Sequence, residues 1–123
     1  MELKSATIHR TVCEEHFASR MKSGTLDVLA TPQMIAWMEE AACKCLEFEE
    51  GKTSVGTCMN VTHDKASSLG ANIDITAEMT EVEGRKIKFQ VIALCNDEII
   101  GKGYHERFIV DSKRFMDKLK DTD

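Results

Sequence analysis

Several features that would place this chain of 123 residues in a specialised class are missing from it. It has one proline and no low-complexity stretch, so nothing in it marks a linker between domains. No apolar run approaches the length that a membrane-spanning helix needs, and no such run follows Met1. We therefore expect a single domain over residues 1–123, located in the cytoplasm.

The spacing of the cysteines excludes two common uses of that residue. There are five cysteines, an odd number, and no two of them form a C-x-x-C pair. Neither a disulfide framework nor a zinc ribbon is predicted from such a pattern. We expect no metal site, and we expect reduced thiols that are mostly buried.

A basic stripe with interleaved aromatic residues is also missing. The net charge is −5 and aromatic residues make up 6% of the chain. Nucleic acid and membrane surfaces are therefore not expected as partners. One basic cluster does occur near the end of the sequence, where aspartates separate its members, and we interpret it as a solvated helix face: Lys113, Arg114, Lys118 and Lys120.

One long helix is predicted over residues 31–47. Its apolar residues recur at steps of three and four and make a broad stripe: Met34, Ile35, Met38, Ala41, Ala42, Cys45 and Leu46. Thr31 followed by Pro32 is typical of a hydroxyl N-cap and a first helical turn. The start of such a helix leaves backbone N–H groups free for an anion or a polarised carbonyl oxygen.

Two adjacent acids on this helix have different surroundings. Glu40 faces water and can pair with Lys44 one turn later. Glu39 is the charged member of an otherwise apolar row. A partly buried carboxylate needs a partner or a raised pKa, which makes it a candidate for acid–base or nucleophilic chemistry. The alternative is that Glu39 lies at the edge of the stripe and reaches water.

The rest of the chain alternates in the manner of antiparallel strands. Strands are predicted over 5–12, 53–63, 72–79, 87–93 and 98–110, with helical turns in 14–21 and a terminal helix at 113–120. Tight turns at 83–84 and 96–97 require antiparallel neighbours. In the strand 53–63, alternation places Val55, Thr57 and His63 on one face and Gly56 on the other. The predicted class is α+β, one helix on an antiparallel sheet.

Four motifs, in order along the chain, carry a resemblance. They are 28–32 leading to Met38-Glu39, 55–57 leading to 61–63, then 80–85, and finally 103–108. Together they resemble the fluoroacetyl-CoA thioesterase-like branch of the hotdog acyl-CoA thioesterases, over residues 28–115. The resemblance implies a hotdog fold, in which a curved antiparallel sheet wraps one long central helix, and it implies a homodimer.

The resemblance also implies a site. A helix-capping Thr, a Glu two turns later and a His on the next strand are catalytic in that family, and Thr31, Glu39 and His63 occupy these positions. Gly56 and Arg107 match a glycine near the thioester and an arginine on the last strand, so both are expected to bind substrate. The segment 22–27 has no aromatic residue, whereas the fluoroacetyl-specific member carries an aromatic lid there. We therefore expect hydrolysis of a short- or medium-chain acyl-CoA rather than discrimination of fluorine, with no cofactor beyond the CoA of the substrate.

Taken one at a time, these residues allow other roles. Thr31 is explained by capping, His63 by the end of a strand, and Gly56 by close packing of helix on strand. Arg107 can pair with Glu39 or Glu106, or face a CoA phosphate. Whether Glu39 is a nucleophile or a general base also stays open. The alternative function is a non-catalytic hotdog module that binds acyl-CoA or an acyl carrier; a hotdog hydratase would need an Asp–His pair that we do not find.

Overall fold

The computed structural model describes residues 1–122. Its elements follow in the order β1 (Ser5–Thr11), η1 (Glu14–His16), α1 (Ala18–Met21), α2 (Thr31–Lys44), β2 (Lys52–His63), β3 (Asn72–Glu83), β4 (Lys86–Cys95), β5 (Glu98–Asp111) and α3 (Ser112–Thr122). The predicted helix and strands are therefore present, and the predicted α+β class is confirmed.

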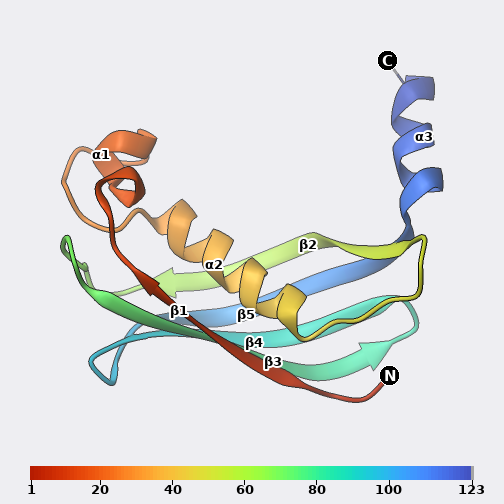
Figure 1. The fold of residues 1–123 in the computed structure, drawn as a ribbon, viewed down its shortest axis with the longest axis horizontal. Helices are drawn as coiled ribbons and strands as arrows, with labels where there is room; N and C mark the ends of the chain where they lie inside the picture. Colours follow the sequence, from red (N-terminus) through yellow and green to blue (C-terminus); the bar gives the residue numbers. More distant parts are fainter. Residues whose placement is uncertain (123) are drawn as a thin grey trace.

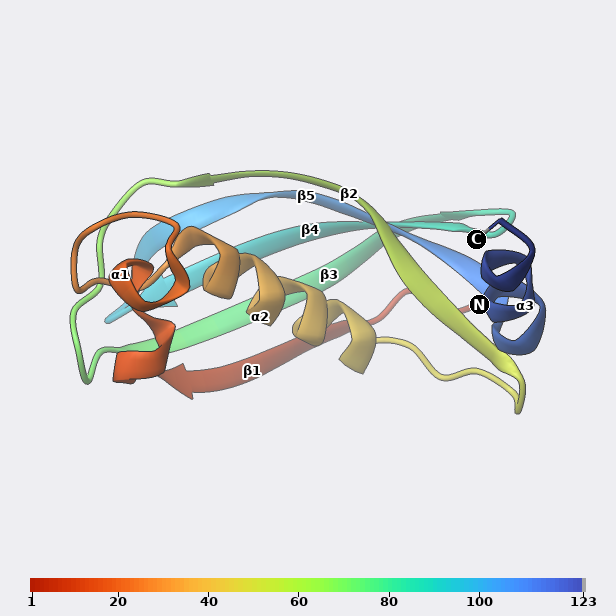
Figure 2. The same ribbon diagram turned by 90° about the horizontal axis from the view of Figure 1, so that it is seen from above.

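The strands form one antiparallel sheet in the order β1-β3-β4-β5-β2. Helix α2 lies across one face of this sheet, as Figures 1 and 2 show from two directions. The turn between β3 and β4 contains Gly84 at φ 63°, and the turn between β4 and β5 contains Asn96 and Asp97 at φ 51° and 64°. Positive φ at both central residues, as at Asn96 and Asp97, or at the first one, as at Gly84, is the backbone of a tight hairpin, so these turns set the antiparallel order.

The core lies between α2 and the sheet. Helix α2 contributes Met34, Met38 and Ala41, which have no exposed surface. The facing strands contribute alternate residues of β3 and β4, again without exposed surface: Ile73, Ile75, Ala77, Ile87, Phe89 and Ala93. Burying one large apolar side chain contributes about 1.5–3 kcal/mol, so this interface fixes the position of α2 and of the groups at its start.

The start of α2 differs from the prediction. The N-cap is Ala30 rather than Thr31, and no side chain caps the helix. The N–H groups of Gln33 and Met34 donate to the Ala30 carbonyl oxygen at 3.1 Å, which closes the first turn through the backbone. The helix ends at Lys44 instead of residue 47. The Thr31 hydroxyl is consequently not used for capping.

The faces of β2 also differ from the prediction. The register of β2 against β5 shifts between Gly56 and Cys58, which makes Thr57 the extra residue of a β-bulge. A bulge reverses the alternation on one side of it. Gly56 therefore faces α2 together with His63, while Val55 and Thr57 face away from the helix.

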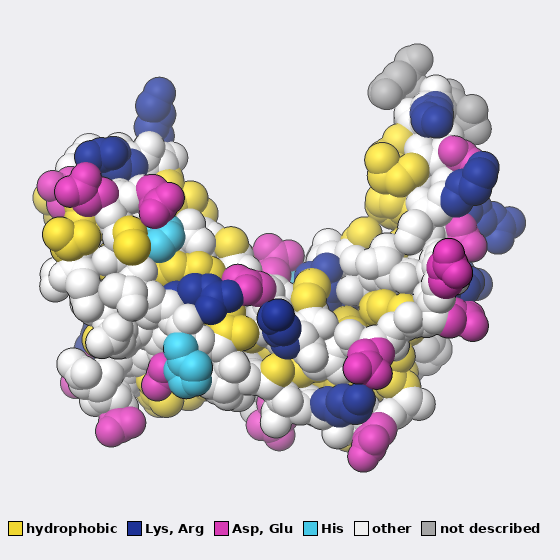
Figure 3. All heavy atoms as spheres, viewed as in Figure 1, with side chains coloured by type: hydrophobic (Ala, Val, Ile, Leu, Met, Phe, Trp, Pro, Cys, Tyr) yellow, Lys and Arg dark blue, Asp and Glu magenta, His cyan; other side chains and the backbone are white. Residues whose placement is uncertain are grey.

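Helix α3 leaves the end of β5 and projects away from the sheet (Figure 1). In the space-filling view, a hollow separates α3 from the part of the molecule that contains α1, and hydrophobic side chains line the side of α3 that faces the hollow (Figure 3). Among the helices of residues 1–122, none is long and apolar enough to cross a membrane.

The thiols are free, but the expectation that most of them are buried is wrong. Cys45 is buried, Cys58 and Cys95 are half-buried, and Cys13 and Cys43 are exposed. Cys43 lies on the solvent side of α2, because residues two apart on a helix point in different directions.

Candidate active site

Thr31 and His63 meet where α2 begins and β2 ends. The Thr31 Oγ1 atom lies 2.8 Å from Nδ1 of His63, which is hydrogen-bond distance. The other ring nitrogen, Nε2, is buried and has no hydrogen-bond partner among the residues that the structure describes. A buried unpaired nitrogen is costly, and the further polar groups that act on this ring are the Lys65 backbone and the Asp64 carboxylate.

The surroundings of His63 keep its ring neutral. Burial lowers the pKa of His63 from its ordinary value of 6.5, and the neighbouring Asp64 carboxylate opposes this without reversing it. At pH 7 the imidazole therefore has one nitrogen that donates and one that accepts. Such a ring can take a proton from a hydroxyl group or from water.

A pocket of about 220 Å³ contains this pair. Thr31 and His63 line it together with residues before α2 and after β2, including Ser23, Val28 and Lys65. Thr31 is exposed and His63 is half-buried, so both are accessible from the pocket. The pair faces a cavity and not the packed core.

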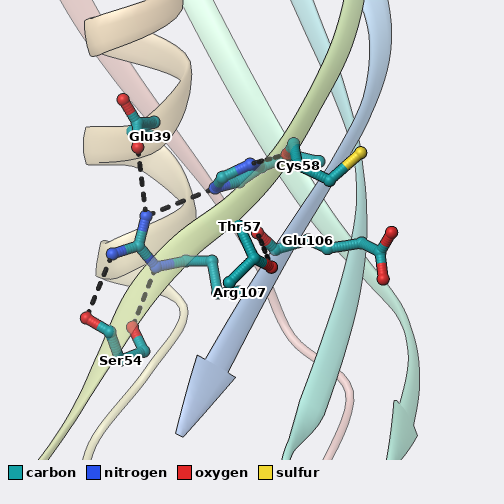
Figure 4. Close-up of polar contacts among 7 residues, drawn as sticks. Glu39, Ser54, Thr57, Cys58, Glu106 and Arg107 are labelled. Carbon is teal, nitrogen blue, oxygen red and sulfur yellow. Dashed lines mark hydrogen bonds and ion pairs between the residues drawn. The ribbon is translucent and has the colours of Figure 1, made fainter. Parts of the chain in front are cut away.

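Glu39 lies further along α2 and pairs with Arg107 of β5 (Figure 4). Arg107 Nη1 is 3.5 Å from Glu39 Oε2; the Arg107 side chain is 8% exposed and the Glu39 side chain 43%. Arg107 also donates from Nε to Ser54 Oγ at 2.8 Å and from Nη2 to the Ser54 carbonyl oxygen at 3.2 Å. Of the partners considered for Arg107, the structure selects Glu39, since Glu106 pairs with Lys86 at 3.4 Å.

His105 completes this second group and was missed by the sequence analysis, as was Ser54. The Nδ1 atom of His105 lies 2.8 Å from the Cys58 carbonyl oxygen, so Nδ1 carries the proton that is donated. Its Nε2 atom is 3.3 Å from Arg107 Nη1 and accepts from it. Burial lowers the pKa of His105, and the Arg107 charge acts in the same direction. The sequence did contain a signal for His105, because His105 is two residues before Arg107 and therefore lies on the same face of the strand.

Gly56 lies directly against the carboxylate of Glu39. A Cβ atom on Gly56 would lie 2.6 Å from Glu39 Oε2 and 3.3 Å from Arg107 Nη1. Real Cβ contacts are essentially never that short, so a side chain at this position would push the Glu39 carboxylate out of its present place. Glu39 is thus half-exposed at the edge of the apolar stripe, which agrees with the alternative that it reaches water. It also has a fixed partner, Arg107.

The site residues form two separate groups within one chain. Thr31 and Glu39 are eight residues apart on α2, which corresponds to about 12 Å along the helix axis. Thr31 and His63 lie at the start of the helix, while Glu39, Gly56 and Arg107 lie near its second half. The structure does not bring Glu39 together with Thr31 and His63 in one copy.

Known proteins resemble this chain over most of its length. A family model described as fluoroacetyl-CoA-specific thioesterase matches residues 12–113. The fluoroacetyl-CoA thioesterase of Streptantibioticus cattleyicolor is 33% identical over 114 residues, which cover 91% of this chain and 82% of that protein. The chain belongs to the fluoroacetyl-CoA-specific thioesterase family. It is a thioester hydrolase, and the predicted resemblance is confirmed.

Solved structures agree with this family membership. A crystal structure of a mutant fluoroacetyl-CoA-specific thioesterase has a TM-score of 0.93 at 28% identity and covers 100% of this chain and 98% of that one. Another mutant, in complex with acetyl-CoA, has a TM-score of 0.93 at 27% identity. The match covers 99% of this chain and 98% of that one. A hot-dog-like protein from Thermanaerovibrio acidaminovorans is 18% identical with a TM-score of 0.89, and the match covers 98% of this chain and 90% of that one. At this identity the likeness supports the fold alone. The hotdog fold is confirmed for this thioesterase family member.

Proposed function

We propose that this protein hydrolyses a short- or medium-chain acyl-CoA to a free acid and CoA, with Thr31, Glu39 and His63 at the site. The observation that carries the proposal is the Thr31–His63 pair. A hydroxyl group that is not needed for capping lies 2.8 Å from a neutral histidine at the wall of a pocket. The fluoroacetyl-CoA thioesterase of Streptantibioticus cattleyicolor shares the family, and a mutant fluoroacetyl-CoA thioesterase is seen in complex with acetyl-CoA.

The chemistry assigns a task to each group. Water must add to the thioester carbonyl carbon, the C–S bond must break, and the thiolate of CoA must leave and take up a proton. His63 can accept a proton from the attacking water or from Thr31. Glu39 is held through Oε2 by Arg107, so Oε1 is the oxygen that can act. It acts either as a base for water or as a nucleophile, in which case an acyl-enzyme anhydride forms and water then cleaves it.

The carbonyl oxygen needs hydrogen-bond donors as negative charge develops on it. Backbone N–H groups at the start of α2 or beside Gly56 are the donors that we propose for this task. Losing one such donor typically costs about 2.7–4 kcal/mol of transition-state stabilisation. Gly56 and Arg107 therefore act in substrate binding and in holding Glu39.

We further propose a homodimer that joins the two groups of site residues. Strand β2 is an edge of the sheet, has 12 residues and keeps one row of backbone groups unpaired. Antiparallel pairing of β2 with β2 of a second copy, centred near Asn60, would place His63 opposite the bulge that contains the partner subunit's Gly56. One copy's Thr31 and His63 would then face the partner subunit's Glu39.

The distribution of exposed apolar residues favours this arrangement. Beyond the first four residues, the large exposed apolar side chains gather at two opposite ends of the folded molecule. Met21, Leu26, Leu69 and Ile99 lie at the His63 end, whereas Phe108, Phe115 and Met116 lie at the α3 end. Antiparallel pairing reverses the ends, so that α3 of one copy would lie beside the His63 end of the other. Each apolar end would then cover its counterpart.

The acyl group is proposed to be short or medium because of the pocket. Its volume of about 220 Å³ is small, and the segment 22–27 beside it has no aromatic side chain that would select among small acyl groups. The cytoplasm remains our predicted location.

The deciding experiment is hydrolysis of an acyl-CoA series from acetyl to octanoyl. The readout is loss of thioester absorbance, since the five cysteines of the protein would react with a thiol reagent. Glu39→Gln and His63→Ala are each expected to lower kcat by about 100-fold or more. Glu40→Gln is the matched control, because Glu40 is the adjacent carboxylate and pairs with Arg10.

The two functions give different results in this series. If wild type turns over and Glu40→Gln resembles it while the site variants fail, the thioesterase assignment holds and the series gives the preferred chain length. Binding of an acyl-CoA without hydrolysis, unchanged in Glu39→Gln, would instead identify the non-catalytic binding module.

A further inference from the structure

His105 is a buried histidine to which the chemistry proposed above gives no task. The residue is 1% exposed, so its ring cannot touch the substrate, and any part it plays in the reaction must pass through a neighbour. The ring contacts Cys58 of β2, Phe89 of β4 and Arg107 of its own strand. Of these three, Arg107 is the one that contacts a group of the candidate site, the Glu39 carboxylate.

The guanidinium of Arg107 is held on two sides (Figure 4). On one side, Nε donates to Ser54 Oγ at 2.8 Å and Nη2 donates to the Ser54 carbonyl oxygen at 3.2 Å. On the other side, Nη1 has two hydrogens and two acceptors, His105 Nε2 at 3.3 Å and Glu39 Oε2 at 3.5 Å. A guanidinium is planar and turns as one unit, so these contacts together fix the direction of the hydrogen that faces Glu39.

The contact with Arg107 requires a neutral His105. Because Nδ1 donates to the Cys58 carbonyl oxygen at 2.8 Å, Nε2 has no proton and accepts from Arg107. Burial and the Arg107 charge lower the pKa of His105, while the Cys58 carbonyl group and the carboxylates of Glu39 and Glu106 act in the opposite direction. A proton on Nε2 would point an N–H group at the guanidinium and place two like charges side by side, so the contact would be lost.

The three side chains converge on the empty space beside Gly56. A Cβ atom on Gly56 would lie 2.6 Å from Glu39 Oε2, 3.3 Å from Arg107 Nη1 and 3.4 Å from His105 Cε1. No side chain of Gly56 itself keeps the guanidinium in place there. Without the contact to His105, the guanidinium can turn toward this space, and the Glu39 carboxylate then turns with it.

We propose that His105 is a positioning residue for thioester hydrolysis. As a neutral acceptor it keeps Nη1 of Arg107 on Oε2 of Glu39, and Oε1 of Glu39 thereby keeps its direction toward the reacting carbon. A displacement of about 1 Å at a reacting group can cost about 100-fold in rate, so a contact of this kind has a measurable effect on kcat. This inference rests on the proposed function, because it concerns the carboxylate of the same site.

Two substitutions separate the hydrogen bonds of His105 from its volume. His105→Leu removes both hydrogen bonds, whereas His105→Gln keeps a donor for Cys58 and an acceptor for Arg107. We expect His105→Leu to lower kcat by about 30-fold or more with KM within about twofold, and His105→Gln to recover most of the loss. A rise in KM with unchanged kcat, or a glutamine variant as slow as the leucine variant, would contradict the proposal.

Phe89→Leu is the control for a merely structural effect. It removes the ring that stacks on His105 and leaves the hydrogen bonds of His105 in place. We expect this variant to unfold at a lower urea concentration and to keep kcat within about twofold of wild type. If it lost kcat as His105→Leu does, at a similar loss of stability, His105 would be a packing residue only and the proposal would be overturned.

The pH profile gives a further readout that packing alone would not change. Protonation of His105 in acid breaks the contact with Arg107, so kcat should fall through His105 as well as through His63 and Glu39. In His105→Gln, log kcat should fall less steeply with pH, because one titrating group is missing. The same slope in both proteins would count against a role for the neutral ring.

A double variant tests whether His105 acts through Glu39. Once Glu39→Gln has removed the carboxylate, adding His105→Leu should slow the enzyme by less than about twofold. Multiplied effects in an active wild type would reject the positioning role and leave the thioesterase function intact. Absence of hydrolysis with every acyl-CoA would refute that function, and with it any part of His105 in the reaction.

Nitrogen NMR of the His105 ring is independent of turnover. At pH 7 it should show a protonated Nδ1 and an unprotonated Nε2. The opposite tautomer, or a doubly protonated ring, would overturn the proposal even in an active thioesterase.

Discussion

The hydroxyl group of Thr31 separates two explanations that the sequence alone left open. A threonine followed by proline at a helix start is usually interpreted as a cap, and removing a true cap costs about 1 kcal/mol of stability. Here Ala30 is the N-cap and the hydroxyl contacts His63. Capping of the helix therefore does not explain this residue, and its role at the site stays a proposal.

Replacing this hydroxyl tests the assignment. Thr31→Val keeps the shape of the side chain and removes the contact with His63 Nδ1. We expect kcat/KM to fall by about 100-fold, in the range of acid–base effects, while the free energy of unfolding changes by less than about 0.5 kcal/mol. Thr31→Ser should retain most activity. Kinetics and urea unfolding check this, and a loss of stability near 1 kcal/mol without loss of activity would restore the capping role.

Gly56 gives a second prediction at this scale. In Gly56→Ala the new methyl group would lie 2.6 Å from Glu39 Oε2, so the carboxylate must move. We expect the fold to persist and kcat to fall by about 100-fold, because a displacement of about 1 Å can cost that much. Thr57→Ala is the matched control, since Thr57 is the neighbouring bulge residue on the other face. An active Gly56→Ala enzyme would mean that the position of Glu39 is not critical.

Family resemblance identified Thr31, Glu39, His63, Gly56 and Arg107 as candidates, but not how they are grouped. The grouping depends on which side chains touch, and Arg107 meets Glu39 only because β5 pairs with β2 in one particular register. Residue spacing within one segment contains no such information. For this reason Ser54 and His105, which hold Arg107, were not found in advance.

Among the elements, β5 couples the site to stability through a row of polar residues on its buried face. His105 donates to β2, accepts from Arg107 and stacks on Phe89 of β4, with ring centroids 5.7 Å apart. Arg107 in turn holds Glu39 of α2. Three strands and the helix therefore meet at two adjacent polar side chains.

This row predicts a loss of stability in mild acid. Burial lowers the pKa values of His105 and His63 below 6.5 in the folded state, so below pH 6.5 the unfolded chain binds protons before the folded chain does. Stability should be level above about pH 7 and should fall as the pH drops from 6.5 through the folded pKa values. Each pKa unit by which the folded and unfolded states differ corresponds to about 1.4 kcal/mol. Urea unfolding between pH 5.5 and 7.5 measures the loss.

His105→Gln is the comparison for this prediction. An amide can still donate to the Cys58 carbonyl oxygen and accept from Arg107, but it does not titrate. The variant should therefore lose less stability between pH 7.5 and 5.5 than wild type does. An identical pH dependence in the two proteins would assign the effect to His63 or to other groups.

The elements were largely predictable because their signals are local. Apolar residues at helical spacing marked α2, and alternation with turns at 83–84 and 96–97 marked β3, β4 and β5. The bulge in β2 was not predictable from alternation, since the extra residue, Thr57, has no distinguishing chemistry of its own. One inserted residue moved Gly56 onto the face of His63, which changed the interpretation of the site.

At the scale of the whole molecule, an open edge lies beside the site. Strand β2 has one unpaired side, and exposed long edges are rarely left uncovered in native proteins. The two halves of the candidate constellation lie about 12 Å apart along α2. Pairing of β2 with β2 of a second copy would cover the open edge and bring the two halves of the constellation together. A variant that prevents this pairing should therefore lose assembly and activity together.

A single charge near the proposed two-fold axis tests this coupling. Asn60 is exposed and points away from α2, so Asn60→Asp should leave the folded chain intact. If two β2 strands pair near Asn60, the variant places two carboxylates opposite each other, which destabilises a strand pair. We expect the variant to dissociate to monomers and to lose activity, with partial recovery of both at high protein concentration.

Lys102→Gln is the matched control for this variant. Lys102 is also exposed, but it lies on β5, which is paired on both sides, its cross-strand partners are Thr62 and Ile92, and the change in net charge is the same. Light scattering gives the mass of each protein and a thioester assay gives its activity. A wild-type protein that is monomeric and fully active would refute the shared site, because one chain would then have to bring Glu39 to His63 by itself. An Asn60→Asp dimer with normal activity would place the interface elsewhere on the molecule.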